Sequence, residues 1–511
     1  MKAIAIARGW IDRLLGTVTP TVLVIICLGV IGVVSLVLSA FGRMPFSPVE
    51  ALASFAITAA GVAGGSWLGA AVTRVKPQVD SMIVTSLVLW CLVLPSLEIG
   101  ALGGLALAAL LAGVSKYLIA WRGRHIFNPA AFGATVVLLL GWVFPSLPSV
   151  PWWVGTPPLL PLVAIGAILV LYRTGTFLTG LTFAVVATAG ALLAFLAAGA
   201  GLDAWESLQL IIGSTPVIFL AGFMLSEPLT LPPLVAQRIG VAALVGVLYT
   251  LPYFGWTPWL VPTMALLAGN LVGFLLGQRT GIRLTVAHVR RLGSSTLEVG
   301  FAPVDRVRFT PGQAIELTIP HEGADLRGSR RVLSIVSAPS APILRVATRI
   351  PADHVSKAKL ALAALEPGDR ITATRIFGDF RLPARGPTVL AAGGIGITPF
   401  LSMLAEHAAS RSGRDIVVIY RSSDPVPPYL DELTALGARV VLFGQADGPL
   451  PPGWVHAGTG RPTPGAVRAA IPDLAERTAL VSGPPSFVAD LTAMLRDAGV
   501  RRIRRDVFSG A

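Results

Sequence analysis

The stretch Val389-Leu-Ala-Ala-Gly-Gly-Ile-Gly-Ile-Thr-Pro-Phe400 joins a short apolar strand to a helix through a glycine-rich turn. Glycines allow a backbone to approach a pyrophosphate closely, and the N-terminus of the helix that follows offers unpaired N–H donors. The turn differs from the GxGxxG of the usual dinucleotide fold, so a tight packing turn without a ligand is the alternative interpretation. Either interpretation indicates a strand–turn–helix unit of an α/β domain.

The surrounding sequence predicts two domains with different patterns of secondary structure. After Thr388, short apolar strands alternate with helices, which is typical of a doubly wound α/β fold, and we assign this fold to residues 386–511. The strand candidates are 389–392, 416–420, 438–443 and 479–481, with helical stretches such as 399–409 and 485–498. Residues 283–385 begin with alternating strands broken by Gly and Pro, which predicts a small antiparallel β-barrel.

The first half of the chain has the composition of a membrane protein. The 511 residues are 54% hydrophobic and only 13% charged, and residues 1–282 hold 12 of the 40 Lys and Arg and 7 of the 27 Asp and Glu. This excludes a single soluble domain, because such a protein carries about 25% charged residues. The formal net charge of +13 does not predict a nucleic-acid partner, because the Lys and Arg residues of the first half lie in loops between apolar stretches.

Charge-free stretches predict about ten membrane-spanning helices over residues 1–280. The first, at about 18–40, is too long for a signal peptide. Two stretches, 125–172 and 239–278, are each long enough for two spans. With the N-terminus in the cytoplasm, eleven Lys and Arg fall inside and only Arg43 falls outside. This bias predicts a multi-pass protein whose C-terminal domains are cytoplasmic.

The residue inventory excludes several cofactors. Cys27 and Cys91 are too few for a four-cysteine iron–sulfur cluster or a zinc site, and we expect no metal. Haem that crosses a bilayer needs paired axial histidines on the spans, and His125 is the only one of six histidines in the first half. A haem-containing ferric reductase or NADPH oxidase is therefore excluded.

Over residues 283–511 the chain resembles the ferredoxin–NADP⁺ reductase superfamily. The motifs that carry the resemblance, in family order, are 309–313 (FTPGQ), 331–339 (RVLSIVSAP), 378–383 (GDFRLP), 391–400, 481–485 (VSGPP) and 506–510 (DVFSG). The resemblance implies FAD bound by Arg331 at the pyrophosphate and by Ser334 near the reactive flavin nitrogen. Leu333 stands where the family usually has a flavin-contacting Tyr. Ser356 and Lys357 match a second phosphate-binding segment.

The same resemblance implies a site for NAD(P)H as substrate. It places Gly393, Gly394, Gly396 and Thr398 at the phosphates. Ser482, Gly483 and Pro484 would lie beside the nicotinamide, and Phe508 would be the terminal aromatic near the flavin, with Ser334, Ser482 and Phe508 forming the catalytic set. Arg421 could meet the 2′-phosphate of NADPH, whereas Asp424 could favour the ribose diol of NADH, and we lean to NADH.

Two segments of the membrane part combine polar residues with proline. In Ser115–Gly133, Lys116, Arg124 and His125 precede Asn128-Pro129. In Gly222–Pro232, Glu227 precedes Pro228, about a hundred residues later. A positive-inside loop explains the cations of the first segment equally well. Broken helices at corresponding places predict two related halves that meet at a central site.

These segments look like a family of membrane proteins found in the Rnf electron-transport complex and in the sodium-translocating NADH:quinone reductase, over about 20–275. The resemblance implies a flavin in the membrane. The Thr-attachment motif of that family is missing from its expected place, so we expect non-covalent FMN or riboflavin near Lys116, Arg124, His125, Asn128 and Glu227. Electrons would leave to a quinone or an extracytoplasmic flavoprotein, with accessory membrane subunits, in a bacterial cytoplasmic membrane. A redox-coupled or redox-regulated ion transporter is the alternative.

Overall fold

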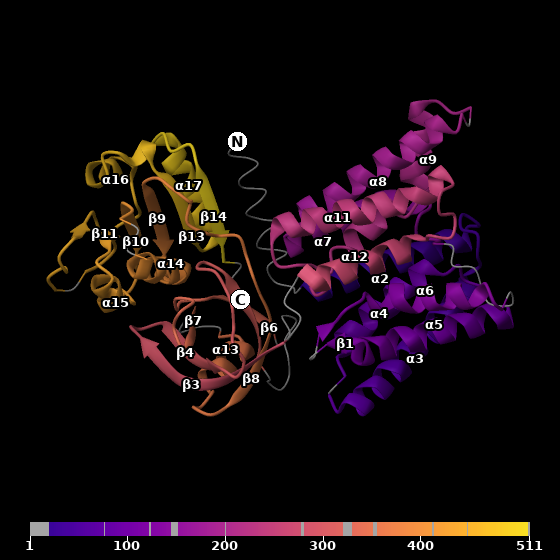
Figure 1. Ribbon diagram of the computed structural model, residues 1–511, viewed down its shortest axis with the longest axis horizontal. Coiled ribbons are helices and arrows are strands. Elements are labelled where there is room, and N and C mark those ends of the chain that lie inside the picture. Colours follow the sequence, from indigo (N-terminus) through magenta and orange to yellow (C-terminus); the bar gives the residue numbers. More distant parts are fainter. Residues whose placement is uncertain are drawn as a thin grey trace. The chain divides into compact units, whose positions relative to one another are not determined.

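The chain forms two compact units, which we call the helical unit and, from Gly281 onward, the C-terminal unit (Figure 1). They are described from a computed structural model. It describes residues 20–75, 77–121, 124–144, 152–199, 201–276, 281–319, 330–350, 355–410, 413–446 and 448–508.

The helical unit contains one long α-helix after another. The α-helices are α2 (Pro20–Ala40), α3 (Pro48–Thr73), α4 (Val79–Leu92), α5 (Ile99–Leu118), α6 (Pro129–Gly141), α7 (Leu160–Thr174), α8 (Phe177–Ala197), α9 (Ala204–Ser214), α10 (Val217–Phe219), α11 (Val235–Thr250) and α12 (Pro262–Leu276). Shorter segments are the hairpin strands β1 (Ala120–Trp121) and β2 (Arg124–His125), the 3₁₀ turns η1 (Pro157–Leu159) and η3 (Leu251–Phe254), and the π-helix η2 (Leu220–Met224).

The number of candidate membrane spans is smaller than the sequence predicts. Among the described residues, six helices are long and apolar enough to cross a membrane, or seven if the pair Ala204–Ser214 and Val217–Met224, bent by 55°, forms one span. The structure thus supports six or seven of the about ten predicted spans, and the shorter apolar helices α4, α6 and α12 would account for the others. Helices α4, α6 and α12 have 14, 13 and 15 residues. They are about 20–23 Å long, whereas the hydrocarbon core of a bilayer is about 30 Å thick.

The long helices are apolar on their outward faces as well as inside the bundle. In α2, Ile26, Val30, Val33 and Val37 form an exposed stripe with helical spacing, while Leu28 and Ile31 are buried. A helix that is hydrophobic all round fits a lipid environment better than water. The helical unit therefore has the properties of a multi-pass membrane domain.

The helix packing of the second half repeats that of the first. Helix α3 packs against α4 and α5, and α5 packs against α6. In the same way α8 packs against α9 and α11, and α11 packs against α12. The first helices of the two halves, α2 and α7, contact each other, as do the last, α6 and α12. This repeated order agrees with the two related halves expected from the sequence.

The C-terminal unit begins with a closed antiparallel barrel. Its strands are β3 (Ile282–Leu292), β4 (Thr296–Pro303), β5 (Ala314–Thr318), β6 (Arg330–Ser334), β7 (Leu344–Arg349) and β8 (Arg370–Phe377), with the short helix α13 (Lys357–Ala363) before β8. The strand order is β6-β5-β8-β3-β4-β7. A bridge between Ile335 and Val346 joins the two edges of the sheet. Alternate side chains such as Leu284, Val299 and Ile315 fill the interior.

A parallel α/β domain follows. Its elements are β9 (Thr388–Gly393), η4 (Gly394–Ile397), α14 (Thr398–Ser410), β10 (Ile416–Arg421), α15 (Leu430–Ala435), β11 (Arg439–Phe443), β12 (Trp454–His456), α16 (Pro464–Ala470), η5 (Leu474–Glu476), β13 (Thr478–Gly483), α17 (Pro485–Asp497) and β14 (Ile503–Val507). The predicted division at residue 386 falls between β8 and β9.

The strand order β12-β11-β10-β9-β13-β14 makes this sheet doubly wound. Leu390 and Ala392 of β9 belong to the hydrophobic cluster of α14 and α15, whereas Val389 and Ala391 belong to that of α16 and α17. The direction of winding reverses between β9 and β13. In open α/β sheets, ligands bind at the carboxyl ends of the strands at such a switch point.

Candidate functional site

The glycine-rich turn packs directly against the end of β13. A Cβ atom added to Gly396 would lie 2.2 Å from the carbonyl oxygen of Ser482, and one added to Gly393 would lie 2.6 Å from the ring of Phe487. Gly394 has a φ of +54°, and a Cβ added there would meet nothing within 4 Å. Two of the glycines are therefore required by packing, while the backbone at Gly394 faces open space that a phosphate could approach.

The end of β13 presents an unused polar atom beside this turn. The Ser482 side chain is fully buried, and its hydroxyl has no hydrogen-bond partner among the residues that the structure describes. Gly483 follows with a φ of +149°, and Pro484 precedes the first turn of α17. A buried hydroxyl without a partner is costly, and a bound ligand that accepts or donates a hydrogen bond would satisfy it.

The terminal strand β14 brings two further side chains to the same edge of the sheet. The backbone N–H of Phe508 donates to the carbonyl of Gly483 at 2.9 Å, and the Phe508 side chain is half-buried. Asp506 lies opposite Ser482 in the parallel register. Burial raises the pKa of the Asp506 carboxyl to about 6. No local sequence pattern indicates Asp506, because its position depends on the pairing of β14 with β13.

The structure changes the interpretation of the two residues considered for nucleotide preference. Arg421 ends β10 in register with Gly393 of β9, which places it next to the glycine-rich turn. The Asp424 carboxylate instead accepts a hydrogen bond from the hydroxyl of Ser294 in the barrel, at 2.7 Å. Asp424 is also 7% exposed. Because Oδ1 of Asp424 is engaged with the barrel, Asp424 gives no support to the preference for NADH.

The residues expected to hold FAD lie in the barrel. Arg331, 5% exposed, and Ser334, 8% exposed, lie on β6, and Nη1 of Arg331 donates to the carbonyl of Arg330 at 2.8 Å. Leu333 packs against the interior of the barrel. The hydroxyl of Ser356 accepts from the backbone N–H of Lys359 at 3.4 Å and so caps α13, and Lys357 is exposed. The buried cation on β6 is the better match to a pyrophosphate.

In the helical unit, the structure brings together four of the five residues expected near a membrane cofactor, three of them by direct hydrogen bonds. Nε2 of His125 lies 3.0 Å from Oε1 of Glu227, and the side-chain amide of Asn128 donates to Oε2 of Glu227 at 3.1 Å. Lys116 donates to the hydroxyl of Ser81 and acts electrostatically on Glu227. The side chain of Arg124 lies outside the described part of the chain. We call Lys116, His125, Asn128 and Glu227 the polar cluster.

Helix breaks position the polar cluster. Asn128 is the N-cap of α6, and its side-chain oxygen accepts from the backbone N–H of Ala131 at 3.0 Å. Glu227 follows the π-helix η2, a type of local distortion that is frequent at functional sites. The backbone N–H of Asn128 donates to Oδ1 of Asn270 in α12, at 2.8 Å. The Asn270 side chain is buried, with 1% exposure. No local sequence pattern indicates Asn270, because it lies 142 residues from Asn128 along the chain.

The barrel and the α/β domain that follows it belong to the part of the chain that is similar to known proteins. The chain is 29% identical over 205 residues to a flavohemoprotein of Deinococcus radiodurans. The aligned region covers 39% of this chain and 50% of the relative. It is 28% identical over 170 residues to the toluate 1,2-dioxygenase electron transfer component of Pseudomonas putida. This aligned region covers 32% of this chain and 49% of that protein. The chain thus spans about half the length of these curated relatives.

Structural similarity extends over a somewhat larger share of the chain. The crystal structure of a ferredoxin NADP⁺ reductase from Neisseria gonorrhoeae with bound FAD and NADP matches with 23% identity and a TM-score of 0.38, covering 44% of this chain and 98% of that one. No family model matches the chain. No match to membrane proteins of Rnf or of the sodium-translocating NADH:quinone reductase was found. The C-terminal unit, an antiparallel barrel followed by a parallel α/β domain, is thus the part of the chain that is similar to parts of these proteins.

Proposed function

We propose that this protein is a membrane-bound oxidoreductase that takes electrons from NAD(P)H onto FAD in the C-terminal unit and delivers them to an acceptor in the helical unit. One observation supports the transfer of electrons from NAD(P)H onto FAD. The glycine-rich turn, the buried Ser482 hydroxyl and Phe508 lie together at the switch point of the parallel sheet. Bound FAD supplies the conversion of a two-electron hydride transfer into single-electron steps.

The residues of the chain contribute positioning to this reaction. The backbone at Gly394 would receive the nucleotide phosphates, and the Ser482 hydroxyl would hydrogen-bond the nicotinamide amide. Arg331 would neutralise the FAD pyrophosphate from β6. Correct placement of two reactants is worth several kcal/mol of a barrier, so positioning contacts of this kind would contribute to hydride transfer.

The polar cluster supports a second site within the helical unit. Ionisable residues within a membrane bundle are rare and usually functional, and here a His–Glu pair coincides with a break in each half of the unit. Imidazole, amide and carboxylate groups match the carbonyl and N–H edges of a quinone or of non-covalent FMN or riboflavin.

An anaerobic titration of the detergent-purified protein with NADH and then NADPH tests the proposal. We expect one FAD plus a second flavin or a bound quinone, and bleaching of the flavin by at least one nucleotide. FAD alone, with no reduction of a soluble quinone analogue, would overturn the part of the proposal that concerns the helical unit. Nucleotide-driven ion flux in proteoliposomes without quinone reduction would favour the redox-coupled transporter instead.

A matched pair of variants separates the two units. Asn128→Ala should keep ferricyanide reduction by NAD(P)H at the wild-type rate and lower quinone-analogue reduction at least about tenfold, because the Glu227 contact is lost. Thr135→Val is the control, because it removes another buried polar contact of α6 with α12, at 2.8 Å to Thr263, outside the polar cluster. Loss of ferricyanide reduction in Asn128→Ala would contradict this division of labour.

A further inference from the structure

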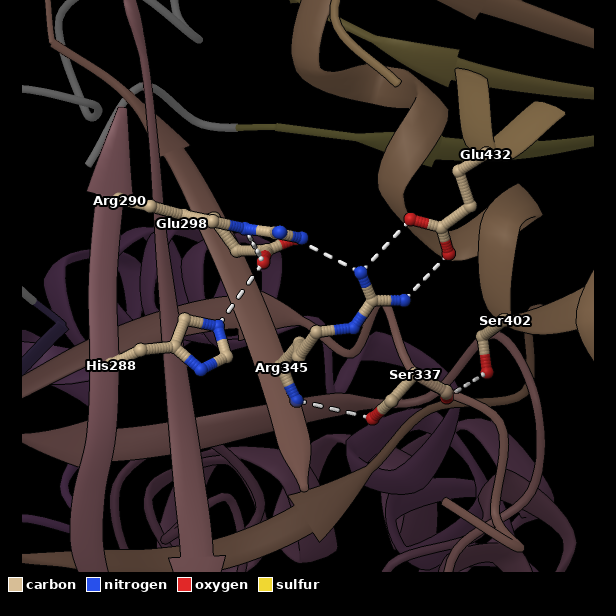
Figure 2. A network of polar contacts seen from close by, with 7 residues as sticks. All are labelled: His288, Arg290, Glu298, Ser337, Arg345, Ser402 and Glu432. Carbon is tan, nitrogen blue, oxygen red and sulfur yellow. Dashed lines mark hydrogen bonds and ion pairs between the residues drawn. The ribbon is translucent and has the colours of Figure 1, made fainter. Parts of the chain in front are cut away.

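A network of charged side chains crosses the boundary between the barrel and the nucleotide domain. Arg345 of β7 makes two hydrogen bonds to Glu432 of α15, from Nη1 to Oε2 at 2.9 Å and from Nη2 to Oε1 at 2.5 Å. The same Nη1 also reaches Oε2 of Glu298 in β4, at 3.3 Å. Figure 2 shows the guanidinium of Arg345 between the two carboxylates, one from each domain.

The two halves of this network differ in burial. The Glu298 side chain has 0% exposure and is also paired with Arg290, at 2.7 Å, whereas the side chains of Glu432 and Arg345 are 26% and 19% exposed. A buried carboxylate needs cations close by, so Glu298 holds Arg345 on the barrel side. The Arg345–Glu432 contact can break without leaving Glu298 uncompensated. It is therefore the part of the network that can open.

Arg345 is also linked to the strand and the helix that carry the cofactor residues. Its backbone N–H donates to the hydroxyl of Ser337 at 3.1 Å, and the hydroxyl of Ser402 donates to the carbonyl of Ser337 at 2.7 Å. Ser337 follows β6, which carries Arg331 and Ser334, and Ser402 lies on α14, directly after the glycine-rich turn. The network thus joins the two segments whose separation sets the distance between flavin and nicotinamide.

The attachment of Glu432 to the nucleotide domain is stiff. It lies in the first turn of α15, and the N-cap residue of that helix, Tyr429, is 7% exposed and has a φ of +66°. Few non-glycine residues adopt that conformation unless their surroundings impose it. Helix α15 follows β10, which pairs with β9. Glu432 is therefore connected through α15 and β10 to the strand that ends in the glycine-rich turn.

We propose that the Arg345–Glu432 ion pair is a positioning contact that holds the nucleotide domain against the barrel in the orientation for hydride transfer to FAD. Neither side chain touches the cofactors in this assignment. The proposal rests on the NAD(P)H:FAD activity of the C-terminal unit and is independent of the acceptor in the helical unit. Since hydride transfer is sensitive to displacements of about 1 Å, loss of the pair should slow the reduction step more than it weakens binding.

The test is anaerobic stopped-flow reduction of the full-length protein by NADH and NADPH, which separates the limiting reduction rate from the nucleotide dissociation constant. Glu432→Gln removes the charge, and we expect a limiting rate about tenfold lower with FAD content and dissociation constant within about twofold of wild type. Asp431→Asn is the matched control, because it changes the same charge on an exposed neighbour in α15. Its limiting rate should stay at the wild-type value.

The dependence of the limiting reduction rate on salt concentration is a second measurement. We expect no such dependence if the ion pair only stabilises the fold. Partly exposed ion pairs are screened at high ionic strength, so the wild-type rate should fall between low and high salt, and the Glu432→Gln rate should be flat. If Glu432→Gln does not retain FAD, Glu432→Asp preserves the charge on a shorter side chain and should show a smaller loss of rate. A wild-type limiting rate in Glu432→Gln, or an equal loss in Asp431→Asn, would overturn the proposal. Failure of both nucleotides to reduce the wild-type flavin would instead overturn the proposed function.

Discussion

Substitution of Gly396 by alanine tests the close packing at the switch point. Gly396 lies in the turn between β9 and α14, and its backbone contacts the end of β13. A Cβ atom at this position would lie 2.2 Å from the carbonyl oxygen and 2.6 Å from the carbonyl carbon of Ser482, and 2.8 Å from Cα of Gly483. All three of these atoms belong to the backbone of a buried strand, so rotation of a side chain cannot relieve the contact.

The size of the effect follows from these distances. Carbon and oxygen atoms in ordinary contact are about 3.5 Å apart, so the turn must move away from β13 by about 1 Å. Overpacking of this kind costs about 1–3 kcal/mol of unfolding free energy. A displacement of about 1 Å near the reacting groups can lower a rate about 100-fold. We therefore expect Gly396→Ala to lower the rate of flavin reduction by NAD(P)H about 10- to 100-fold, with a modest loss of stability.

The assay is the same stopped-flow measurement, combined with thermal unfolding of the detergent-purified protein. The control is Gly465→Ala in the first turn of α16, where an added Cβ meets nothing within 4 Å and the φ is not positive. Alanine is favoured over glycine in a helix by about 0.5–1 kcal/mol, so the control should be as stable as wild type or more so, with an unchanged rate. A wild-type rate and nucleotide affinity in Gly396→Ala would refute the assignment of this turn to the nucleotide site.

Three further predictions concern other parts of the C-terminal unit. Arg331→Ala should weaken FAD retention at least about tenfold, because a charge-assisted contact to the pyrophosphate is lost; flavin counted after denaturation checks this, and full occupancy would contradict it. The Asp506 pKa is raised by burial from 3.8 to about 6, so the folded state disfavours the carboxylate. Unfolding free energy should be unaffected below about pH 4 and fall by at most about 3 kcal/mol as the pH rises through 6, and Asp506→Asn should abolish this slope in denaturant titrations. Arg477→Met removes bonds to the carbonyls of Thr388 and Asp415 at the opposite end of the sheet. It should cost about 2–3 kcal/mol of unfolding free energy and leave the reduction rate unchanged, and a slower reduction would contradict the separation of stability from function along the strands.

The glycine-rich turn shows both the strength and the limit of the sequence pattern. Its position between an apolar strand and a helix predicted the α/β unit, whereas Ser482 and Phe508 were expected near the cofactors only from the family resemblance. The pattern treated its glycines alike, whereas Gly393 and Gly396 are required by contacts with Phe487 and Ser482. These contacts come from the pairing of β9 with β13, about ninety residues later. A local sequence motif contains no information on which later strand will lie beside it.

The number of candidate spans among the described residues differs from the prediction for a related reason. Charge-free stretches locate apolar segments well, and each predicted stretch does contain helix. Such a stretch does not show where the helix begins and ends. Helix α6 begins only at Pro129, after the hairpin of β1 and β2, so it keeps 13 residues of a much longer uncharged stretch. Proline at the first helical position and the Asn128 cap set that boundary. The helix ends at Gly141, so its length of about 20 Å is below the thickness of a bilayer.

The shortened helices explain why the polar cluster forms where it does. The pairs Asn128–Asn270 and Thr135–Thr263 show that α6 and α12 run antiparallel, since seven residues forward along one helix correspond to seven residues back along the other. Each helix begins with a proline, at Pro129 and Pro262. The polar groups freed by the break before α6 turn inward, because apolar lipid cannot satisfy them. Glu227, after the π-helix of the other half, completes the set. The halves of the helical unit therefore meet through hydrogen bonds at their interrupted helices, and a redox carrier with ring carbonyl groups would find both donors and acceptors at this place.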